Sequence, residues 1–510
     1  MRVFAFLPLV ALAWAGDPTV VKTMSGIVRG AEAHGVISWK GIPYAAPPVG
    51  NLRWREPQPA VAWGSRVLDA KQFGPACMQT DKVAKSEDCL TLNVWRPANA
   101  TEPLPVMVWI HGGAMVHGSS AIYPANALAA QGVVVVSMNY RLGRLGYFAH
   151  PALAVETPNE VHGNYGFMDQ RAALQWVQRN IAAFGGDPKQ VTIFGESSGG
   201  GSVLAHLVSP MSRGLFQRAI LQSPGTPGPR AGAIPSTSLA AAEKLAVDYA
   251  CSIGATGEGA DALQKLRALP AAALTEATGG PETIEALSSG LVPAGMAMSI
   301  IDGRFLVERP EAALATGRQA KVPVMIGATD RDLAIGTAHS KDELFANFRP
   351  DAEEARRLYD PNGDQTIDEL KQQVFADRTL VEPARHFAKE MARTGQPVWL
   401  YRFAYVSDGQ RGQLKGTQHA FEIPLTFNLP AALVGDKVTG ADKAMSDLAV
   451  GYWVQFAKTG DPNGAGRSAW PRYDPKVDRL VLFTNSGVLV GADPLKARLD
   501  LWERVWNQGH

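Results

Sequence analysis

Apolar residues along this chain fall into short blocks that are separated by amphipathic stretches. The blocks are four or five residues long and rich in Val, Ile and Leu, which is typical of strands buried on both faces of a sheet. Such blocks predict strands at residues 106–110, 133–136, 191–194, 219–222 and 322–326.

The stretches between and after these blocks predict helices and a second group of strands. Leu174, Val177 and Ile181 recur at helical spacing and predict a helix over 169–184, which two glycines end. Because strands and helices alternate, the pattern predicts an α/β fold. Other helices are expected within 199–208, 236–287 and 342–393, and other strands at 398–406, 479–483 and 488–490.

Composition narrows the class of protein. The chain has 510 residues, of which 46% are hydrophobic and 19% charged, as in a globular protein with a large core. A formal net charge of +1 gives no reason to expect nucleic acid or an anionic membrane as a partner. No Cys/His cluster has the spacing of a zinc site, and no metal or cofactor is expected.

Residues 1–15 have the pattern of a cleavable secretory signal. An apolar run follows Arg2, and Ala13-Trp14-Ala15 fits a small-x-small cleavage site before Gly16. A membrane anchor is the alternative, but the run is too short to span a bilayer, and no other stretch is long enough. The sequence therefore predicts a secreted or periplasmic protein whose residues 16–510 form one domain.

The three cysteines fit an exported protein, in which a disulfide can form. Cys77 and Cys89 are close in sequence and flank a polar loop, so they are the natural pair. Cys251 is then left over. Three buried thiols are the alternative.

The strongest chemical signal is Gly195-Glu196-Ser197-Ser198-Gly199, which lies between a predicted strand and a predicted helix. A G-x-S-x-G motif in this context is a nucleophile elbow. The turn is so tight that small residues must flank the serine. Its hydroxyl stands at the helix N-terminus, where the helix dipole stabilises developing negative charge. Ser197 is therefore the candidate nucleophile.

A serine nucleophile needs a histidine base. In this arrangement the acid follows the serine in the chain, and the histidine follows the acid. His419 lies on a loop beyond the predicted strand 398–406, where such a histidine is expected. His206 and His386 lie in predicted helices, so His419 is the candidate base.

The base in turn needs a carboxylate that orients it. The predicted strand 322–326 leads into Asp330 and Asp332, and both are candidates. Their spacing alone does not choose between them.

Donors for a tetrahedral oxyanion are expected after the strand 106–110, in the segment His111-Gly112-Gly113-Ala114. Glycines let backbone N–H groups approach a substrate oxygen, as in HGGG-type loops. The N–H groups of Gly113, Ala114 and Ser198 are the predicted oxyanion hole.

With these motifs in view, the chain resembles the type-B carboxylesterase family, the carboxylesterase and cholinesterase-like α/β hydrolases, from about residue 21 to residue 506. The resemblance implies a large, mostly parallel central sheet flanked by helices, with helical insertions. Besides the elbow it rests on Gly41-Ile42-Pro43-Tyr44-Ala45, Ser86-Glu87-Asp88-Cys89-Leu90, Asn139-Tyr140-Arg141, Gly163-Asn164-Tyr165-Gly166, Asp169-Gln170, Gly460-Asp461-Pro462-Asn463-Gly464 and Trp470-Pro471.

The resemblance also implies roles for single residues of the site. The family's acid, usually Glu, corresponds to Asp332, and the family's histidine corresponds to His419. Leu333 replaces the glycine that usually follows the acid, which keeps Asp330 as the alternative. Ser223 resembles a serine that supports the acid, and Glu196 is expected to support the nucleophile.

Two further matches concern the scaffold. Cys77 and Cys89 resemble the family's N-terminal disulfide, with Cys251 as a free thiol. Glu87 and Arg141 resemble a buried ion pair that supports the fold.

Together the motifs predict a serine hydrolase that cleaves small-molecule carboxylic esters to acid and alcohol through an acyl-enzyme. A specialist hydrolase or lipase for one natural ester is an alternative within the same chemistry. A non-catalytic binding member of the fold usually lacks the serine or the histidine, and this chain keeps both. The walls of the substrate site are expected from residues 280–320 and 333–380.

Overall fold

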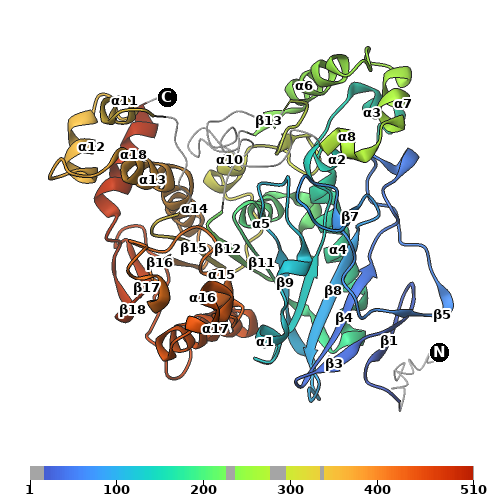
Figure 1. Ribbon diagram of the computed structural model, residues 1–510, viewed down its shortest axis with the longest axis horizontal. Coiled ribbons are helices and arrows are strands. Elements are labelled where there is room, and N and C mark those ends of the chain that lie inside the picture. The colour runs from blue at the N-terminus through green and yellow to red at the C-terminus, as the bar shows by residue number, and fades with distance from the viewer. Residues whose placement is uncertain (1–15, 225–235, 276–293, 333–337, 509–510) are drawn as a thin grey trace, which may run out of the picture.

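The computed structural model describes residues 16–224, 236–275, 294–332 and 338–508 (Figure 1). In these residues the central element is an 11-stranded sheet in the order β18-β17-β16-β15-β12-β11-β9-β10-β8-β4-β3. Neighbours from β17 to β10 in this order are parallel, and antiparallel strands lie at both edges. This confirms the predicted α/β fold with a large, mostly parallel sheet.

The strands of this sheet have the following bounds: β3 (Ala31–Ala33), β4 (Val36–Pro43), β8 (Thr91–Pro97), β9 (Leu104–Ile110), β10 (Val134–Met138), β11 (Gly186–Glu196), β12 (Arg218–Gln222), β15 (Val324–Thr329), β16 (Val398–Phe403), β17 (Arg479–Thr484) and β18 (Gly487–Ala492). Every predicted strand is present. The largest difference is at β11, which begins five residues before the predicted start at 191.

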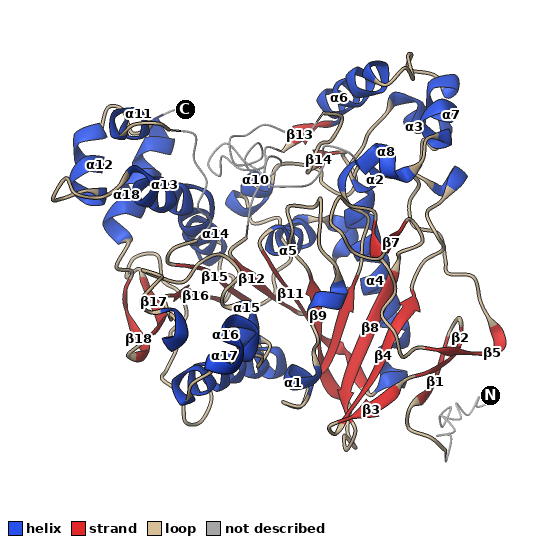
Figure 2. Ribbon diagram, viewed as in Figure 1, coloured by secondary structure: helices blue, strands red, loops and turns tan. Residues whose placement is uncertain are grey.

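Strand β9 shows why these runs are apolar throughout. Val106, Val108 and Ile110 point into one hydrophobic cluster, whereas Met107 and Trp109 point into another on the opposite face. Successive side chains of a strand alternate between faces, so a strand covered on both sides must be apolar at every position. Figure 2 shows helices on both sides of the sheet. The first cluster includes α4 (Tyr165–Asn180), α5 (Ser198–Val208) and α14 (Glu382–Arg393), and the second includes α17 (Gly440–Thr459).

The predicted helix 169–184 starts earlier than expected, at Tyr165. Its last turn, Ile181–Phe184, is a 3₁₀-helix. Gly185 then ends the helix in the left-handed conformation, with φ 77°, as the two glycines predicted. The early start was hidden because the first turn is buried all round and has no polar face to mark it.

The helical insertions lie at two upper corners of the molecule in Figure 1. One group lies within the predicted helical region 236–287, of which the structure describes 236–275, and the other corresponds to the predicted region 342–393 and begins one residue before it. The groups are α6 (Leu239–Ser252), α7 (Ala260–Ala268) and α8 (Ala271–Thr275), and α11 (Lys341–Ala346), α12 (Ala352–Tyr359) and α13 (Ile367–Ala376), against which the C-terminal helix α18 (Lys496–Gln508) packs.

Smaller elements complete the described chain. The strands β1 (Val20–Thr23), β2 (Gly26–Arg29) and β5 (Gly64–Asp69) form a separate three-stranded sheet. Two-stranded pairs are formed by β6 (Ala76–Cys77) with β7 (Lys85–Ser86) and by β13 (Thr237–Ser238) with β14 (Ile300–Ile301). The short helices are α1 (Asn126–Ala129), α2 (Gly143–Gly146), α3 (Pro151–Glu156), α10 (Pro310–Ala315), α15 (Ile423–Thr426) and α16 (Ala431–Val434).

A disulfide joins Cys77 and Cys89, as predicted, and Cys251 is a free, exposed thiol. The prediction that Glu87 and Arg141 form an ion pair is wrong. Glu87 instead pairs with Arg53 at 2.7 Å, and the Arg141 guanidinium pairs with both carboxylate oxygens of Asp169 at 2.7 Å. A guanidinium can form a bidentate pair with any carboxylate that lies in its plane, and the fold of the chain decides which carboxylate is placed there.

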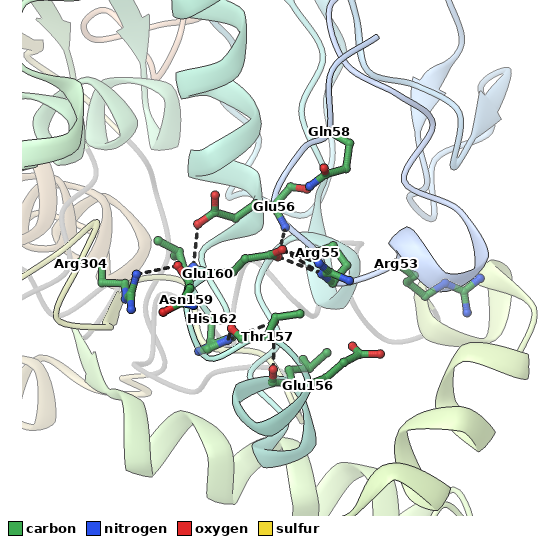
Figure 3. A network of polar contacts seen from close by, with 12 residues as sticks. Arg53, Arg55, Glu56, Gln58, Glu156, Thr157, Asn159, Glu160, His162 and Arg304 are labelled. Carbon is green, nitrogen blue, oxygen red and sulfur yellow. Dashed lines mark hydrogen bonds and ion pairs between the residues drawn. The ribbon is translucent and has the colours of Figure 1, made fainter. Parts of the chain in front are cut away.

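A network of polar contacts holds the segment after β4 to the loop after α3 (Figure 3). The Arg55 guanidinium donates to Glu160 at 2.5 Å, and Glu160 also accepts from the backbone N–H of Glu56 at 2.9 Å. The Glu56 carboxylate accepts from the backbone N–H of Val161 at 2.7 Å. Arg304 ties a third segment to this loop by donating to the Asn159 carbonyl at 2.6 Å. Three stretches far apart in sequence are thus joined at one place.

Some predictions concern residues outside those that the structure describes. The signal segment 1–15 is one, and parts of the expected substrate-site walls, at 280–293 and 333–337, are others. In the part of the chain that is described, no helix combines the length and the apolar character needed to cross a bilayer.

Candidate active site

The candidate site lies at the carboxyl ends of the parallel strands in the middle of the central sheet. The strands β9, β11, β12, β15 and β16 are parallel neighbours, so their carboxyl ends meet at the same edge. Ligand sites of open α/β sheets form outside the carboxyl ends of the strands. The segments that leave these ends carry His111, Ser197, Ser223, Asp332 and, further along the chain, His419.

Ser197 occupies the sharp turn between β11 and α5. Its backbone has φ 57° and ψ −127°, a region that costs a non-glycine residue about 1–3 kcal/mol. Its N–H donates to the Gln222 carbonyl at 3.0 Å, and its own carbonyl accepts from the N–H of Gly201 at 2.9 Å. A Cβ atom on Gly199 would lie 2.1 Å from the Ile110 carbonyl oxygen, so the elbow requires glycine there. The serine itself is half-buried and remains within reach of solvent.

His419 and Asp332 are joined by a hydrogen bond between His419 Nδ1 and Asp332 Oδ1. The other carboxylate oxygen, Asp332 Oδ2, accepts from Ser223 Oγ at 2.6 Å and from the Thr329 N–H at 3.2 Å. Asp332 is 1% exposed, whereas the His419 side chain is 17% exposed. A buried, well-anchored acid thus holds an imidazole that substrate can reach.

Asp330, the alternative acid, faces a different partner. Its carboxylate accepts from the backbone N–H of Thr417 at 2.7 Å, and the next residue, Arg331, donates its N–H to the Thr417 carbonyl at 3.1 Å. Burial raises the pKa of Asp330 to about 6. For Asp332, burial acts in the same direction, but the contacts to His419 and Ser223 outweigh it and lower the pKa. Of the two carboxyl groups, Asp332 is therefore the one held as an anion beside the imidazole.

A second carboxyl group lies on the other side of the imidazole. His419 Nε2 is 3.2 Å from Glu196 Oε1, although the two are not aligned as a hydrogen bond. Burial raises the pKa of Glu196 to about 8. Burial also disfavours a charge on His419, but the carboxylates of Glu196 and Asp332 outweigh it and raise the pKa of the imidazole. A proton on His419 therefore favours an ionised Glu196, and a neutral His419 leaves Glu196 protonated.

The Gly113 and Ala114 segment forms a tight turn directly after β9. A Cβ atom on Gly112 would lie 2.7 Å from the Glu196 carbonyl oxygen and 3.1 Å from Ser197 Cβ, so the turn packs on the elbow. The Met115 N–H donates to Ser198 Oγ at 3.2 Å and joins the turn to the first residue of α5. The structure thus brings the predicted oxyanion donors into two adjoining segments beside Ser197.

The sequence analysis missed buried polar residues around the site. Glu422 accepts from Gln222 Nε2 at 3.2 Å, and Gln222 Oε1 accepts from the indole N–H of Trp453 at 3.0 Å. Burial raises the pKa of Glu422 to about 7. Its position three residues after His419 was the signal that could have drawn attention to it. Gln79, in the loop between Cys77 and Cys89, is also buried, and no motif in the sequence pointed to a role for it.

His206 illustrates a histidine that lies outside this arrangement. It is buried in α5, where its ring nitrogens contact Ser212 Oγ at 2.8 Å and Gln170 Oε1 at 3.0 Å. Burial lowers its pKa to about 3, so it stays neutral as a packing residue. Across the described residues, no group of three or more His, Cys, Asp or Glu side chains is arranged to hold a metal ion.

Comparisons with known proteins agree along almost the whole chain. A model of the carboxylesterase family matches residues 17–502. Fumonisin B1 esterase of Sphingopyxis macrogoltabida is 36% identical over 94% of this chain and 90% of that protein. Para-nitrobenzyl esterase of Bacillus subtilis strain 168 is 35% identical over 93% and 96%, and cocaine esterase of Oryctolagus cuniculus is 34% identical over 95% and 96%. A solved structure of PNB esterase matches with a TM-score of 0.79 and 33% identity, covering 95% of this chain and 100% of that one.

Proposed function

Because the chain belongs to the carboxylesterase family and is a carboxylic-ester hydrolase of the α/β-hydrolase fold, we propose that it acts through a triad of Ser197, His419 and Asp332. The observation that carries the proposal is the line of contacts from Ser223 through Asp332 to His419, whose second ring nitrogen faces the residue before Ser197. This line provides a base and an orienting acid, and the nucleophile, Ser197, is the next residue after Glu196.

The first half of the reaction is acylation. His419 takes the proton of Ser197 as Oγ attacks the ester carbonyl carbon. The backbone N–H groups of Gly113, Ala114 and Ser198 bind the oxyanion that forms, and each such donor contributes about 2.7–4 kcal/mol to the stabilisation of the transition state. The imidazolium is stabilised by the Asp332 carboxylate, and it then gives its proton to the oxygen of the leaving alcohol.

The second half is deacylation. His419 takes a proton from water, whose oxygen attacks the acyl carbonyl, and the same oxyanion donors bind the second tetrahedral intermediate. Collapse returns the proton to Ser197 and releases the acid. Asp332 is one methylene shorter than the family's usual Glu. Two hydrogen bonds to its second oxygen, from Ser223 and Thr329, fix the shorter side chain against the imidazole.

The proposal is tested by covalent labelling. Diethyl p-nitrophenyl phosphate should transfer its diethylphosphoryl group to Ser197 Oγ and release p-nitrophenolate in a single equivalent, which absorbance measures. Mass spectrometry of the digested protein should find the adduct on the peptide that contains Ser197. An adduct on another residue, or no stoichiometric release from a protein that hydrolyses esters, would contradict the assignment.

The names of these relatives refer to three different compounds or groups, fumonisin B1, para-nitrobenzyl and cocaine. We therefore propose a small-molecule ester substrate and take p-nitrophenyl esters of increasing acyl length as the assay series. A general carboxylesterase should favour the short members, whereas a lipase should favour the long ones.

We further propose that the protein is exported. The basic start, the apolar run and the cleavage motif Ala13-Trp14-Ala15 support this, and the disulfide between Cys77 and Cys89 suits an oxidising compartment. Amino-terminal sequencing of protein from the periplasm or medium should begin near Gly16. A chain that keeps residue 1 in the cytoplasm would contradict export.

A further inference from the structure

The loop closed by Cys77 and Cys89 contacts the turn that carries the proposed oxyanion donors, residues 111–118, and the buried side chain at this contact is Gln79. Gln79 is 2% exposed, and its amide pairs with both backbone groups of Gly118. Gln79 Oε1 accepts from the Gly118 N–H at 2.9 Å, and Gln79 Nε2 donates to the Gly118 carbonyl at 2.9 Å. The same Nε2 donates to the Cys77 carbonyl at 2.9 Å, which fixes the side chain to its own loop.

Gly118 is the far end of the oxyanion turn, and it packs back on the beginning of that turn. It has φ 112°, and a Cβ atom there would lie 2.6 Å from His111 Nδ1 and 2.7 Å from the Gly112 carbonyl oxygen. The N–H groups of Val116 and His117 both donate to the Gly113 carbonyl at 3.0 Å. A displacement of Gly118 is therefore passed to the peptide groups of Gly112 and Gly113.

The turn between these ends is strained. Ala114 has φ 52° and Met115 has φ 59°, both in the left-handed region that non-glycine residues rarely adopt. Such residues persist only where surrounding contacts determine the backbone. On one side Met115 is held by the N–H of Gly143, which donates to its carbonyl at 2.8 Å, and by its own bond to Ser198. Gln79 supplies the restraint at the far end.

A weaker contact runs parallel to this one. His117 Nδ1 lies 3.7 Å from Asp81 Oδ2, also in the disulfide loop. The two side chains are 29% and 47% exposed and 3.7 Å apart, so solvent screens the pair and it contributes little. The buried amide of Gln79 is therefore the contact that determines how the loop and the turn fit together.

We propose that Gln79 is a positioning residue of the oxyanion hole, and that the disulfide loop serves to hold it there. This inference rests on the proposed function, because it takes the N–H groups of Gly113 and Ala114 as the oxyanion donors. Without Gln79 the strained turn relaxes, and these donors move away from the oxygen of the tetrahedral intermediate. Since they bind the transition state more strongly than the ester, the loss falls on kcat rather than on KM.

The first variant is Gln79→Met, which keeps the volume and length of the side chain and removes all three hydrogen bonds. We expect kcat for a p-nitrophenyl ester to fall about 10- to 100-fold, as displaced catalytic groups do, with KM within about threefold of wild type. A trifluoromethyl ketone, whose adduct with Ser197 carries the oxyanion, should lose affinity by the same factor as kcat. The control is Gln264→Met, the same change at an exposed position of α7, which should leave all three quantities unchanged.

The second variant is Gln79→Glu. An ionised carboxylate has acceptors only and cannot donate to the Gly118 carbonyl, whereas a protonated carboxyl can make both bonds to Gly118 and lacks only the second donor that the amide gives to the Cys77 carbonyl. We expect the ratio of its kcat to the wild-type kcat to rise as the pH falls. The same ratio for Gln79→Met should not depend on pH. A residue that only supports the fold would not show this difference between the two variants.

The outcomes separate this inference from the proposed function. The positioning role would be overturned if Gln79→Met keeps kcat within threefold of wild type, or if its KM rises by the same factor as its affinity for the ketone falls. In either case Ser197→Ala would still abolish activity. A pH-independent ratio for Gln79→Glu would also overturn it, and this measurement decides the matter if Gln79→Met does not fold. Full activity in Ser197→Ala would instead overturn the proposed function itself.

Discussion

Ser197→Ala should lower kcat for ester hydrolysis by on the order of 10⁵- to 10⁶-fold, the cost of removing the nucleophile from a serine triad. The reason is that the acyl-enzyme can no longer form, and water must attack the ester directly with help from the oxyanion donors alone. KM should change little, because the serine hydroxyl contributes little to ester binding. The measurement is steady-state hydrolysis of a short p-nitrophenyl ester by the purified enzyme.

The matched control is the same substitution at the neighbouring residue. Ser198→Ala keeps the backbone N–H that the mechanism uses and removes only the hydroxyl that accepts from the Met115 N–H. One such neutral hydrogen bond contributes about 0.5–1.5 kcal/mol, so we expect at most a tenfold effect on kcat. Activity of Ser197→Ala within tenfold of wild type, or equal losses at positions 197 and 198, would be incompatible with Ser197 as the nucleophile.

Asp332→Asn should lower kcat by about 10⁴-fold, as the loss of the orienting carboxylate does in a serine triad. An amide at this position can donate to His419 Nδ1, which leaves the proton on Nε2 and the imidazole in the wrong tautomer to accept from Ser197. It also removes the anion that stabilises the imidazolium. The loss should appear in the rate of p-nitrophenolate release during both acylation and turnover.

Asp330→Asn is the matched control, since the same change is made two residues away on the same loop. The amide oxygen can still accept from the Thr417 N–H, so the contact between this loop and the segment before His419 survives. We expect less than about a tenfold loss in kcat, in line with one altered hydrogen bond. A larger loss at position 330 than at position 332 would reverse the assignment of the acid.

The parts of this protein that were readable from sequence are those in which structure and chemistry are local. The elbow is five consecutive residues, and its glycines are required by contacts within a few ångströms of the serine. The strand 106–110 is apolar at every position because both its faces are covered, a property that the residues themselves carry. The predicted disulfide between Cys77 and Cys89 was likewise a short-range pairing.

Element boundaries were less accurate where tertiary packing replaces the usual signals. Helix α4 begins at Tyr165, four residues before the predicted start, because its first turn is buried on all sides and shows no amphipathic period. Strand β11 likewise continues to Gly186 through polar residues that no apolar block predicts.

Contacts between distant segments were decided by the fold alone. Asp330 and Asp332 leave the same strand two residues apart, and only the three-dimensional path of the His419 loop shows that one meets the imidazole and the other a backbone amide. The predicted partner of Arg141, Glu87, was wrong for the same reason. Several carboxylates can pair with a guanidinium, and the packing of the chain selects Asp169.

Residue order thus revealed which chemical groups this protein has and the short turns that present them, because sterics and hydrogen bonding act between neighbours. The parallel strands bring together loops that are more than thirty residues apart in sequence, and this decides which groups meet at the carboxyl ends of the strands. The contact between Gln79 and Gly118 is one example. Such meetings are set by the packing of the whole core, and no local pattern of residues records them.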